Sequence, residues 1–261
     1  MKLYTHSPKL GTVAIKAKSL KLCTSWYIYL YQNGEYDRTE VNESVCRERA
    51  AAIATPGPVC LDIEAFHFED GDWEYAQAQM LTAIRIYREN LPLNNRLGIY
   101  NFMPTRNYWT PVNYHANPKK YKQEMKDWRT HNSLFKSDRR DSLSYRSHAG
   151  VADAVDVVFP SLYQFYHDVP NQLVYIKANI KEARRYNKPI IAWVWSQIHG
   201  SNPSGHAGEY VGDESILRQL DLLDRMGIEG VVFLNSKVDA PDSFYDLLES
   251  RWSGTIQEVT T

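Results

Sequence analysis

The sequence lacks the features that mark several common classes of protein. Its three cysteines, Cys23, Cys46 and Cys60, form no CxxC pair or Cys/His cluster, so neither a disulfide framework nor a structural zinc site is expected. No apolar run is long enough to cross a bilayer, and the first twenty residues, 1–20, lack the apolar run of a signal peptide. We therefore expect no membrane partner and a cytoplasmic protein by default, or a secreted one if a leader was removed.

Charge and nucleotide motifs are also missing. Lysine plus arginine number 30 against 31 for aspartate plus glutamate, without a long basic block, so no nucleic-acid partner is expected. No GxGxxG or GxxxxGK loop is present, and His67, His167, His199 and His206 show no HxH or HExxH spacing. We expect neither a cofactor nor a metal, although a metal-dependent hydrolase using these histidines stays an alternative. The oligomeric state is left open.

Aromatic residues, in contrast, are abundant. The chain has 18 tyrosines and 7 tryptophans, many of them at or just past the ends of strand-like runs. Aromatic side chains at interior positions belong to the core. Their flat faces also stack on the C–H faces of sugar rings, so the composition permits a carbohydrate-binding cleft.

Strand-like and helix-like runs alternate along the chain. The expected strands lie near 26–31, 59–65, 96–102, 155–163, 188–195 and 230–236, and the expected helices near 40–54, 72–91, 118–136, 171–186, 214–226 and 241–250. This alternation is typical of βα units around a parallel sheet. It predicts one α/β domain over residues 1–261, a (β/α) TIM-like barrel of seven or eight strands with an irregular excursion near 103–150. A doubly wound open sheet is the alternative.

Two acids close the second expected strand. Asp62 and Glu64 are two positions apart, so on a strand they share one face while Leu61 and Ile63 share the other. Two neighbouring carboxylates push their pKa values apart, which lets one act as a proton donor near neutral pH while the other stays ionised. Ordinary surface acids at a solvated strand end are the alternative interpretation.

Polar and aromatic residues follow the other expected strands at the same relative position. Cleavage of a glycosidic bond needs a carboxylic acid to protonate the leaving oxygen and a negative or nucleophilic group at the reacting carbon. Two acids on one strand do not easily flank opposite faces of a sugar, which favours attack by the sugar's own 2-acetamido oxygen. The residues predicted to share this site are Tyr100, Asn101, Ser161, Tyr163, Trp193, Trp195, Gln197, Asn235 and Ser236.

Several segments carry a resemblance to a known family. They are Asp62-Ile63-Glu64, Gly98-Ile99-Tyr100-Asn101-Phe102-Met103-Pro104, Phe159-Pro160-Ser161-Leu162-Tyr163, Glu182-Ala183-Arg184, Pro189-Ile190-Ile191 and Gly230-Val231-Val232-Phe233-Leu234-Asn235-Ser236. In order and spacing they are similar to motifs of the hyaluronidase family of glycoside hydrolases, over about 59–236. The chain departs from that pattern at Leu234, where the family has tryptophan, and in Ala65-Phe66-His67-Phe68 after the acid pair.

The resemblance implies a role for four residues. Glu64 would be the acid/base, Asp62 would position the acetamido group, and Tyr100 and Tyr163 would hold that group and the reacting ring. Muramidases with an Asp-x-Glu pair at a strand end, and a barrel that binds sugar without cutting it, are the alternatives. The segment 197–210 is expected to be a βα loop that closes over a saccharide, with Glu209 as a further carboxylate.

Overall fold

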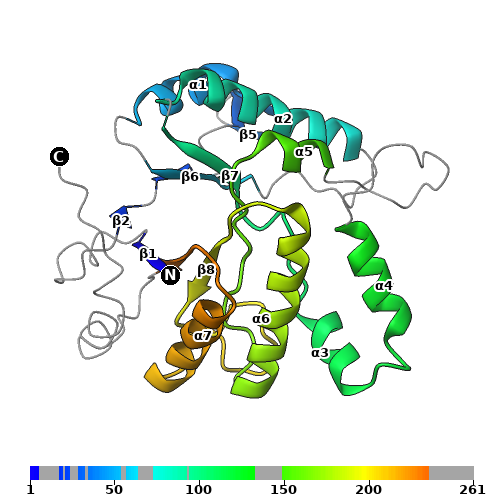
Figure 1. Ribbon diagram of the computed structural model, residues 1–261. Coiled ribbons are helices and arrows are strands. Elements are labelled where there is room, and N and C mark those ends of the chain that lie inside the picture. The colour runs from blue at the N-terminus through cyan, green and yellow to red at the C-terminus, as the bar shows by residue number, and fades with distance from the viewer. Residues whose placement is uncertain are drawn as a thin grey trace.

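The structure is a computed structural model in which helices follow parallel strands, as in an α/β protein (Figure 1). It describes residues 1–5, 18–19, 21–23, 29–32, 35–53, 57–63, 73–92, 94–132 and 149–234. The strands are β1 (Lys2–Thr5), β2 (Lys18–Ser19), β3 (Lys21–Cys23), β4 (Tyr29–Gln32), β5 (Glu35–Val41), β6 (Pro58–Leu61), β7 (Arg96–Ile99), β8 (Ile191–Trp195) and β9 (Gly230–Leu234). The helices are α1 (Glu43–Ala51), α2 (Trp73–Asn90), α3 (Trp109–Ala116), α4 (Lys122–His131), α5 (Ala149–Ala154), α6 (Val169–Ala183), the short 3₁₀ helix η2 (Arg184–Tyr186) and α7 (Asp213–Arg225).

The parallel strands pair in two groups. One group has the order β2-β1-β9-β8 and the other the order β3-β6-β7, and every pairing within them is parallel. The segment 158–161 joins the groups, because Phe159 bridges Tyr100 beyond β7 while Val158 bridges Ile190 and Ser161 bridges Trp193 at β8. The predicted strand 155–163 is therefore present as a set of parallel bridges between β7 and β8.

The two faces of these strands belong to two separate hydrophobic clusters. The larger cluster lies between strands and helices and holds aliphatic strand residues such as Leu61, Ile63 and Ile99. The smaller cluster is formed by the opposite face and consists of Cys60, Tyr100, Val157, Phe159, Tyr163, Ile191, Trp193 and Val232. Because side chains alternate along a strand, Asp62 follows Cys60 onto the second face, which we call the inner face. The predicted common face of Leu61 and Ile63 is confirmed, and the inner-face position of Asp62 follows from alternation.

Gly98 is required by this inner face. A Cβ atom at Gly98 would lie 2.2 Å from the carbonyl oxygen of Val157 and 2.7 Å from the ring of Phe159. Both distances are far below van der Waals contact, so the absence of a side chain at Gly98 lets Phe159 fill the space between neighbouring strands.

The first predicted strand, 26–31, was assigned to the wrong kind of sheet. Its described part, β4, pairs antiparallel with β5, and Gln32 lies opposite Glu35. Asn33-Gly34 between them is the dipeptide that two-residue hairpin loops favour, so the sequence does hold the signal for this hairpin. In the parallel groups, β1 pairs with β9, β2 pairs with β1, and β3 pairs with β6. These three strands are too short for a clear periodic pattern.

The helices begin and end where their capping residues predict. Asn42 caps α1 by accepting the backbone N–H of Val45 at 3.1 Å, and Asp168 caps α6 through Asn171 at 2.9 Å. Gly212 directly precedes α7, and beyond its end Gly227 has a left-handed φ of 65°, the conformation that glycine favours after a helix. The predicted helix 241–250 lies outside the described residues.

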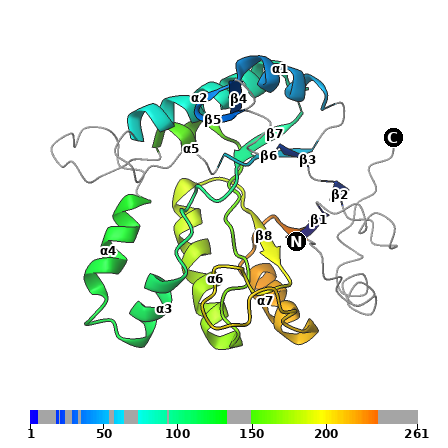
Figure 2. The same cartoon turned by 180° about the vertical axis from the view of Figure 1, so that it is seen from behind.

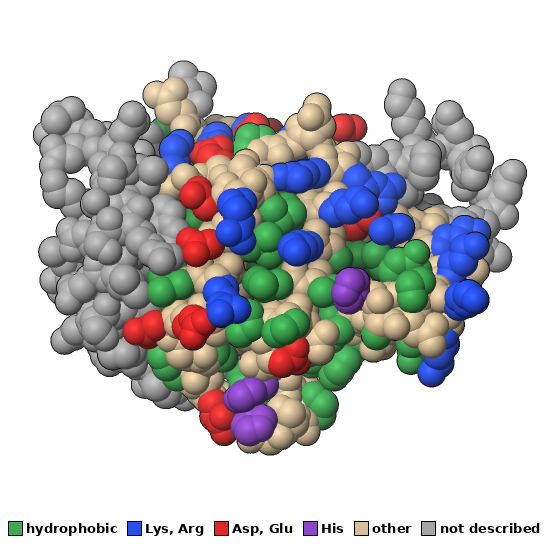
Figure 3. Space-filling view, turned by 60° about the horizontal axis from the view of Figure 1, so that its bottom comes forward, with side chains coloured by type: hydrophobic (Ala, Val, Ile, Leu, Met, Phe, Trp, Pro, Cys, Tyr) green, Lys and Arg blue, Asp and Glu red, His purple; other side chains and the backbone are tan. Residues whose placement is uncertain are grey.

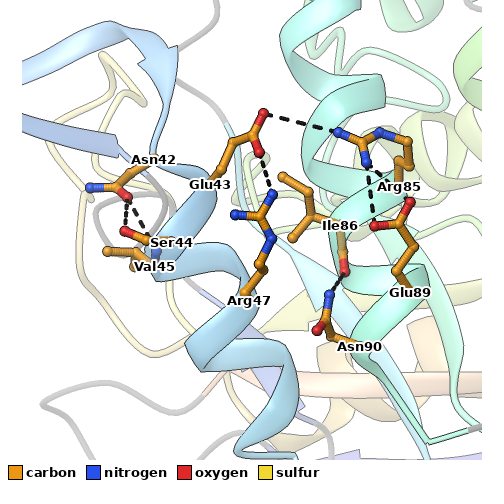
Figure 4. A network of polar contacts seen from close by, with 9 residues as sticks. All are labelled: Asn42, Glu43, Ser44, Val45, Arg47, Arg85, Ile86, Glu89 and Asn90. Carbon is orange, nitrogen blue, oxygen red and sulfur yellow. Dashed lines mark hydrogen bonds and ion pairs between the residues drawn. The ribbon is translucent and has the colours of Figure 1, made fainter.

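Polar contacts join α1 to α2 on the solvent side. Glu43 accepts from Arg47 at 2.5 Å and lies 4.0 Å from Arg85, which also contacts Glu89 at 3.0 Å (Figure 4). Figures 1 and 2 show these two helices side by side over β6 and β7, whereas α6 and α7 lie beside β8. Exposed pairs of this kind contribute little, so the buried aliphatic cluster between helices and strands holds the layers together.

The predicted excursion near 103–150 contains ordered helices in its described part. α3 packs on α6, and α4 packs on α3, so both extend the helical layer beside β8 (Figure 2). Trp128 and Met125 are the buried residues of α4. Within the described ranges, no helix combines the length and apolar character needed to cross a membrane.

Candidate active site at the carboxyl ends of the strands

Asp62 lies at the carboxyl end of β6, next to Tyr100 of the neighbouring strand. Leu61 pairs with Ile99, and the Tyr100 N–H donates to the Leu61 carbonyl at 2.8 Å. Asp62 and Tyr100 are therefore adjacent in register on the inner face, where Asp62 is partly buried and Tyr100 is buried. This register brings together two of the four residues predicted to be catalytic.

Ser161 connects Tyr100 to the next strand. The Tyr100 hydroxyl donates to the Ser161 hydroxyl at 3.0 Å, and the guanidinium of Arg106 donates to the same oxygen at 3.4 Å. From behind, the buried Tyr175 hydroxyl of α6 donates to the Ser161 carbonyl at 2.7 Å. These hydrogen bonds fix the position of the Tyr100 hydroxyl, so that a ligand would meet a phenol of defined orientation.

Aromatic rings form a wall beside Tyr100. The Tyr163 ring lies 5.9 Å from Tyr100 and 5.6 Å from Trp195, and His199 lies 6.0 Å from both Tyr163 and Trp195. Trp193 packs edge-on at 5.5 Å from Tyr100 and is only 1% exposed, so it supports Tyr100 from within. Figure 3, in which the bottom of Figure 1 comes forward, shows hydrophobic side chains across the middle of the face.

A buried glutamine network holds the backbone after Ser161. Gln172 of α6 accepts the N–H groups of Phe165 and Tyr166 at 3.1 and 3.2 Å and donates to the Tyr163 carbonyl at 3.3 Å. Gln219 of α7 donates to Gln164 at 2.5 Å, which ties a second helix to the same segment. Since buried amides are costly unless satisfied, this network specifies one conformation for the segment that carries Tyr163.

Sequence reasoning missed a cation and two rings at this site. Arg106, on the segment after β7, lies with its guanidinium carbon 5.0 Å from the centre of the Tyr108 ring, a cation–π contact. Tyr108 in turn lies 5.6 Å from His199. Burial and, second, the positive charge of Arg106 lower the pKa of His199 below its usual value. The only signal in the sequence for a role of Arg106 in the site is its position shortly after a strand end.

The remaining predicted site residues have different placements. Asn101, directly after Tyr100, has a left-handed φ of 55° and is partly exposed. Gln197 is buried and pairs with Tyr210 across the loop 197–210, which folds back on itself. Glu64, Asn235 and Ser236 lie outside the described residues.

A surface hollow lies at the opposite ends of the strands. Its volume is about 430 Å³, and its lining residues are Arg184, Asn187, Lys188, Pro189, Ile190, Gly227, Ile228 and Glu229. These residues precede β8 and β9, so the hollow opens at the amino ends of the strands. In α/β enzymes with parallel strands the chemistry occurs at the carboxyl ends, and we therefore place the candidate active site with Asp62 and Tyr100.

Comparison with known proteins identifies the fold. No protein-family model matches the chain, and no curated protein is significantly similar to it in sequence. Among solved structures, the chain is similar to bee venom hyaluronidase in a monoclinic crystal form, with a TM-score of 0.59 and 12% identity over 98% of this chain and 99% of that one. For bee venom hyaluronidase in complex with a hyaluronic acid tetramer, the TM-score is 0.54, at 12% identity over 97% and 96%. At this identity the likeness establishes a shared α/β fold across nearly the whole chain.

Proposed function

We propose that the protein is a glycoside hydrolase that cleaves a polysaccharide or oligosaccharide at an N-acetylhexosamine. The observation that carries the proposal is the register of β6 and β7, which puts Asp62 beside Tyr100 on the inner face at the carboxyl ends of the strands. The aromatic wall of Tyr163 and Trp195 beside them offers ring faces on which a sugar can stack. The shared fold with bee venom hyaluronidase supports the same end of the strands as the site.

The proposed reaction uses the acetamido group of the substrate as nucleophile. Glu64 protonates the leaving oxygen and then removes a proton from water, and Asp62 orients and stabilises the acetamido group. Tyr100 and Tyr163 hold that group and the reacting ring. Two carboxylates on one strand suit this route, because both act from one side of the sugar.

Six further residues are proposed to bind sugar or to support the residues that do. Trp195 offers a ring face, Asn101, Asn235 and Gln197 offer hydrogen bonds, and Ser161 and Trp193 support Tyr100. We further propose that the two groups of parallel strands belong to one sheet, with β2 at the edge of one group and β3 at the edge of the other as neighbours. The parallel strands would then close into a barrel with the acid pair at its mouth.

Replacing Glu64 by glutamine tests the proposal. Purified protein is assayed on glycosaminoglycans, chitooligosaccharides and peptidoglycan, and the best substrate is used for the variant. Loss of the proton donor should reduce turnover by about 10²–10⁴-fold without weakening oligosaccharide binding. Glu48→Gln, an exposed change on α1, is the matched control and should keep full activity. A thiazoline mimic of the cyclised acetamide should inhibit the wild type.

Two outcomes would contradict the proposal. A wild-type protein that binds these saccharides and cleaves none of them would be a binding barrel, an alternative that Leu234 in place of the family's tryptophan favours. Trapping by a fluorosugar, without inhibition by the thiazoline, would identify a covalent nucleophile and exclude the acetamido route.

A further inference from the structure

Three metal-binding side chains meet at the surface near the site. His167, His206 and Glu209 each present one ligand atom, and the three atoms lie within 4.8 Å of one another. The His167 and His206 rings are 4.8 Å apart, and His206 Nδ1 lies 2.8 Å from a carboxylate oxygen of Glu209. Figure 3 shows two adjacent histidine side chains with an acidic side chain beside them at the lower edge of the molecule.

We propose that these residues bind a divalent transition-metal ion, with Zn²⁺ as the reference ligand. Tetrahedral Zn²⁺ binds imidazole nitrogen and carboxylate oxygen at about 2.0–2.2 Å, which corresponds to ligand atoms about 3.3 Å apart. The three side chains reach this geometry by small rotations, because His167 and Glu209 are exposed and His206 is partly exposed. Two nitrogens and one oxygen favour Zn²⁺ over Mg²⁺ and Ca²⁺, which prefer oxygen ligands alone. Water completes the coordination.

The ion would tie two loops together. His206 and Glu209 belong to the loop between β8 and α7, whereas His167 directly precedes Asp168, the N-cap of α6. The two loops already touch, since the His199 N–H donates to the Gln164 carbonyl at 2.7 Å. Asn202 also donates to the Phe165 carbonyl, and a metal bridge would add a further link at the tip of the loop, where Gly205 and Gly208 both have left-handed φ angles.

The loop that carries His206 and Glu209 also contacts the candidate active site, through His199. His199 begins the loop and packs against Tyr163 and Trp195, whereas the metal ligands at the far end are exposed. Bound metal would therefore hold the loop against the aromatic wall. The inference does not depend on the proposed hydrolase activity.

Calorimetric titration of the chelator-treated full chain with Zn²⁺ tests the site. We expect one ion per chain, an affinity at least tenfold lower in His167→Gln and in His206→Gln, and no binding of Mg²⁺ or Ca²⁺ at the same concentration. His115→Gln, an exposed histidine on α3, is the matched control and should bind as the wild type does. Saturating Zn²⁺ should raise the Tm by on the order of 5 °C in wild type and control.

Hydrogen exchange tests the link between the loops. Zn²⁺ should slow exchange of backbone amides in 198–210 and 164–168 in the wild type but not in His206→Gln. No binding, or equal binding by both histidine variants and the wild type, would overturn the site. Binding that leaves exchange in both loops unchanged would overturn the link.

Discussion

The two ends of the parallel strands carry different chemistry. At the amino ends, Glu229 accepts two hydrogen bonds from Arg96 at 2.6 and 2.7 Å and lies 3.3 Å from Lys2. Asp156 similarly accepts from Arg88 at 2.5 Å and from the Leu97 N–H at 2.9 Å. The charges at this end are neutralised in pairs, and each acid also helps to hold a strand or its connection in place.

The carboxyl ends instead hold hydroxyl groups, aromatic rings and two charged side chains that follow different strands. Tyr100, Ser161 and Arg106 share one hydrogen-bonded cluster, and Asp62 lies beside it in register. Groups at this end are positioned by residues behind them, such as Tyr175 and Gln172 of α6. The difference teaches that the acids at the amino ends serve stability, whereas the carboxyl ends carry the groups proposed to act on a substrate, as in barrel enzymes.

Asp62→Asn, at the carboxyl ends of the strands, should have the largest effect: it should reduce turnover without changing stability. Its charge is proposed to stabilise the acetamido group as it attacks, so turnover on an N-acetylhexosaminide should fall by about 100-fold or more. The backbone position of Asp62 is set by β6 and β7, so the Tm should change little. Steady-state kinetics and thermal unfolding of the same preparation measure both quantities.

Asp153→Asn on α5 is the matched control for this variant, because Asp153 is exposed and lies on a helix that precedes a strand segment and not at a carboxyl end. It should leave both turnover and Tm unchanged. If the turnover of Asp62→Asn equals that of the wild type, Asp62 does not have the role assigned to it. The proposed functional difference between the two ends of the strands would then lack support.

Glu229→Gln, at the amino ends of the strands, should do the opposite: it should lower stability and leave turnover unchanged. The change leaves Arg96 and Lys2 without their carboxylate in a partly buried position, which should cost about 1–2 kcal/mol of stability and lower the Tm by about 3–6 °C. Turnover should be unchanged. Glu48→Gln, which alters an exposed glutamate of α1, controls for loss of one negative charge.

The same variant has a defined pH dependence. Hydrogen bonding and charge from Arg96 hold the pKa of Glu229 below its usual value, although burial opposes this. The stabilisation is therefore complete above the unfolded pKa of about 4.3 and is lost as the pH falls through the lower folded pKa. The Tm difference between wild type and Glu229→Gln should narrow below about pH 4. A difference that stays constant would show that lost packing, and not the charge, causes the destabilisation.

The sequence predicted the parallel part of the fold because the strands there are buried and regular. β7, β8 and β9 fall within their predicted ranges and β6 begins one residue before its own, since each is an apolar run between turn or capping residues. β1, β2 and β3 were missed because two to four residues give no periodicity. The predicted strand 26–31 was wrong about its partner, because strand propensity does not distinguish a hairpin from a parallel strand.

For the candidate site too, the sequence predicts the residues at strand ends but not those that loops bring together. The positions of Tyr100, Ser161 and Tyr163 beside one another follow from strand ends and alternation, both of which are visible in the sequence. Arg106 and the pairing of His167 with His206 depend on how loops fold, and no spacing rule connects residues on different loops. Asp62 and Glu64 stay linked by alternation alone, since Glu64 lies outside the described residues.

The smallest expected effect concerns Arg106, whose positive charge acts on the ring of His199. Arg106→Gln should raise the pKa of His199 part of the way toward its usual value, because burial, the larger cause of the lowered pKa, persists. NMR titration of the His199 ring protons measures the change. Arg225→Gln, at the end of α7 just before β9, should leave that pKa unchanged. A lower pKa of His199 in Arg106→Gln would mean that the guanidinium does not act on the ring through its charge. With the predicted sign, Arg106 helps to keep His199 neutral at pH 7, so that the aromatic wall presents uncharged ring faces to a sugar.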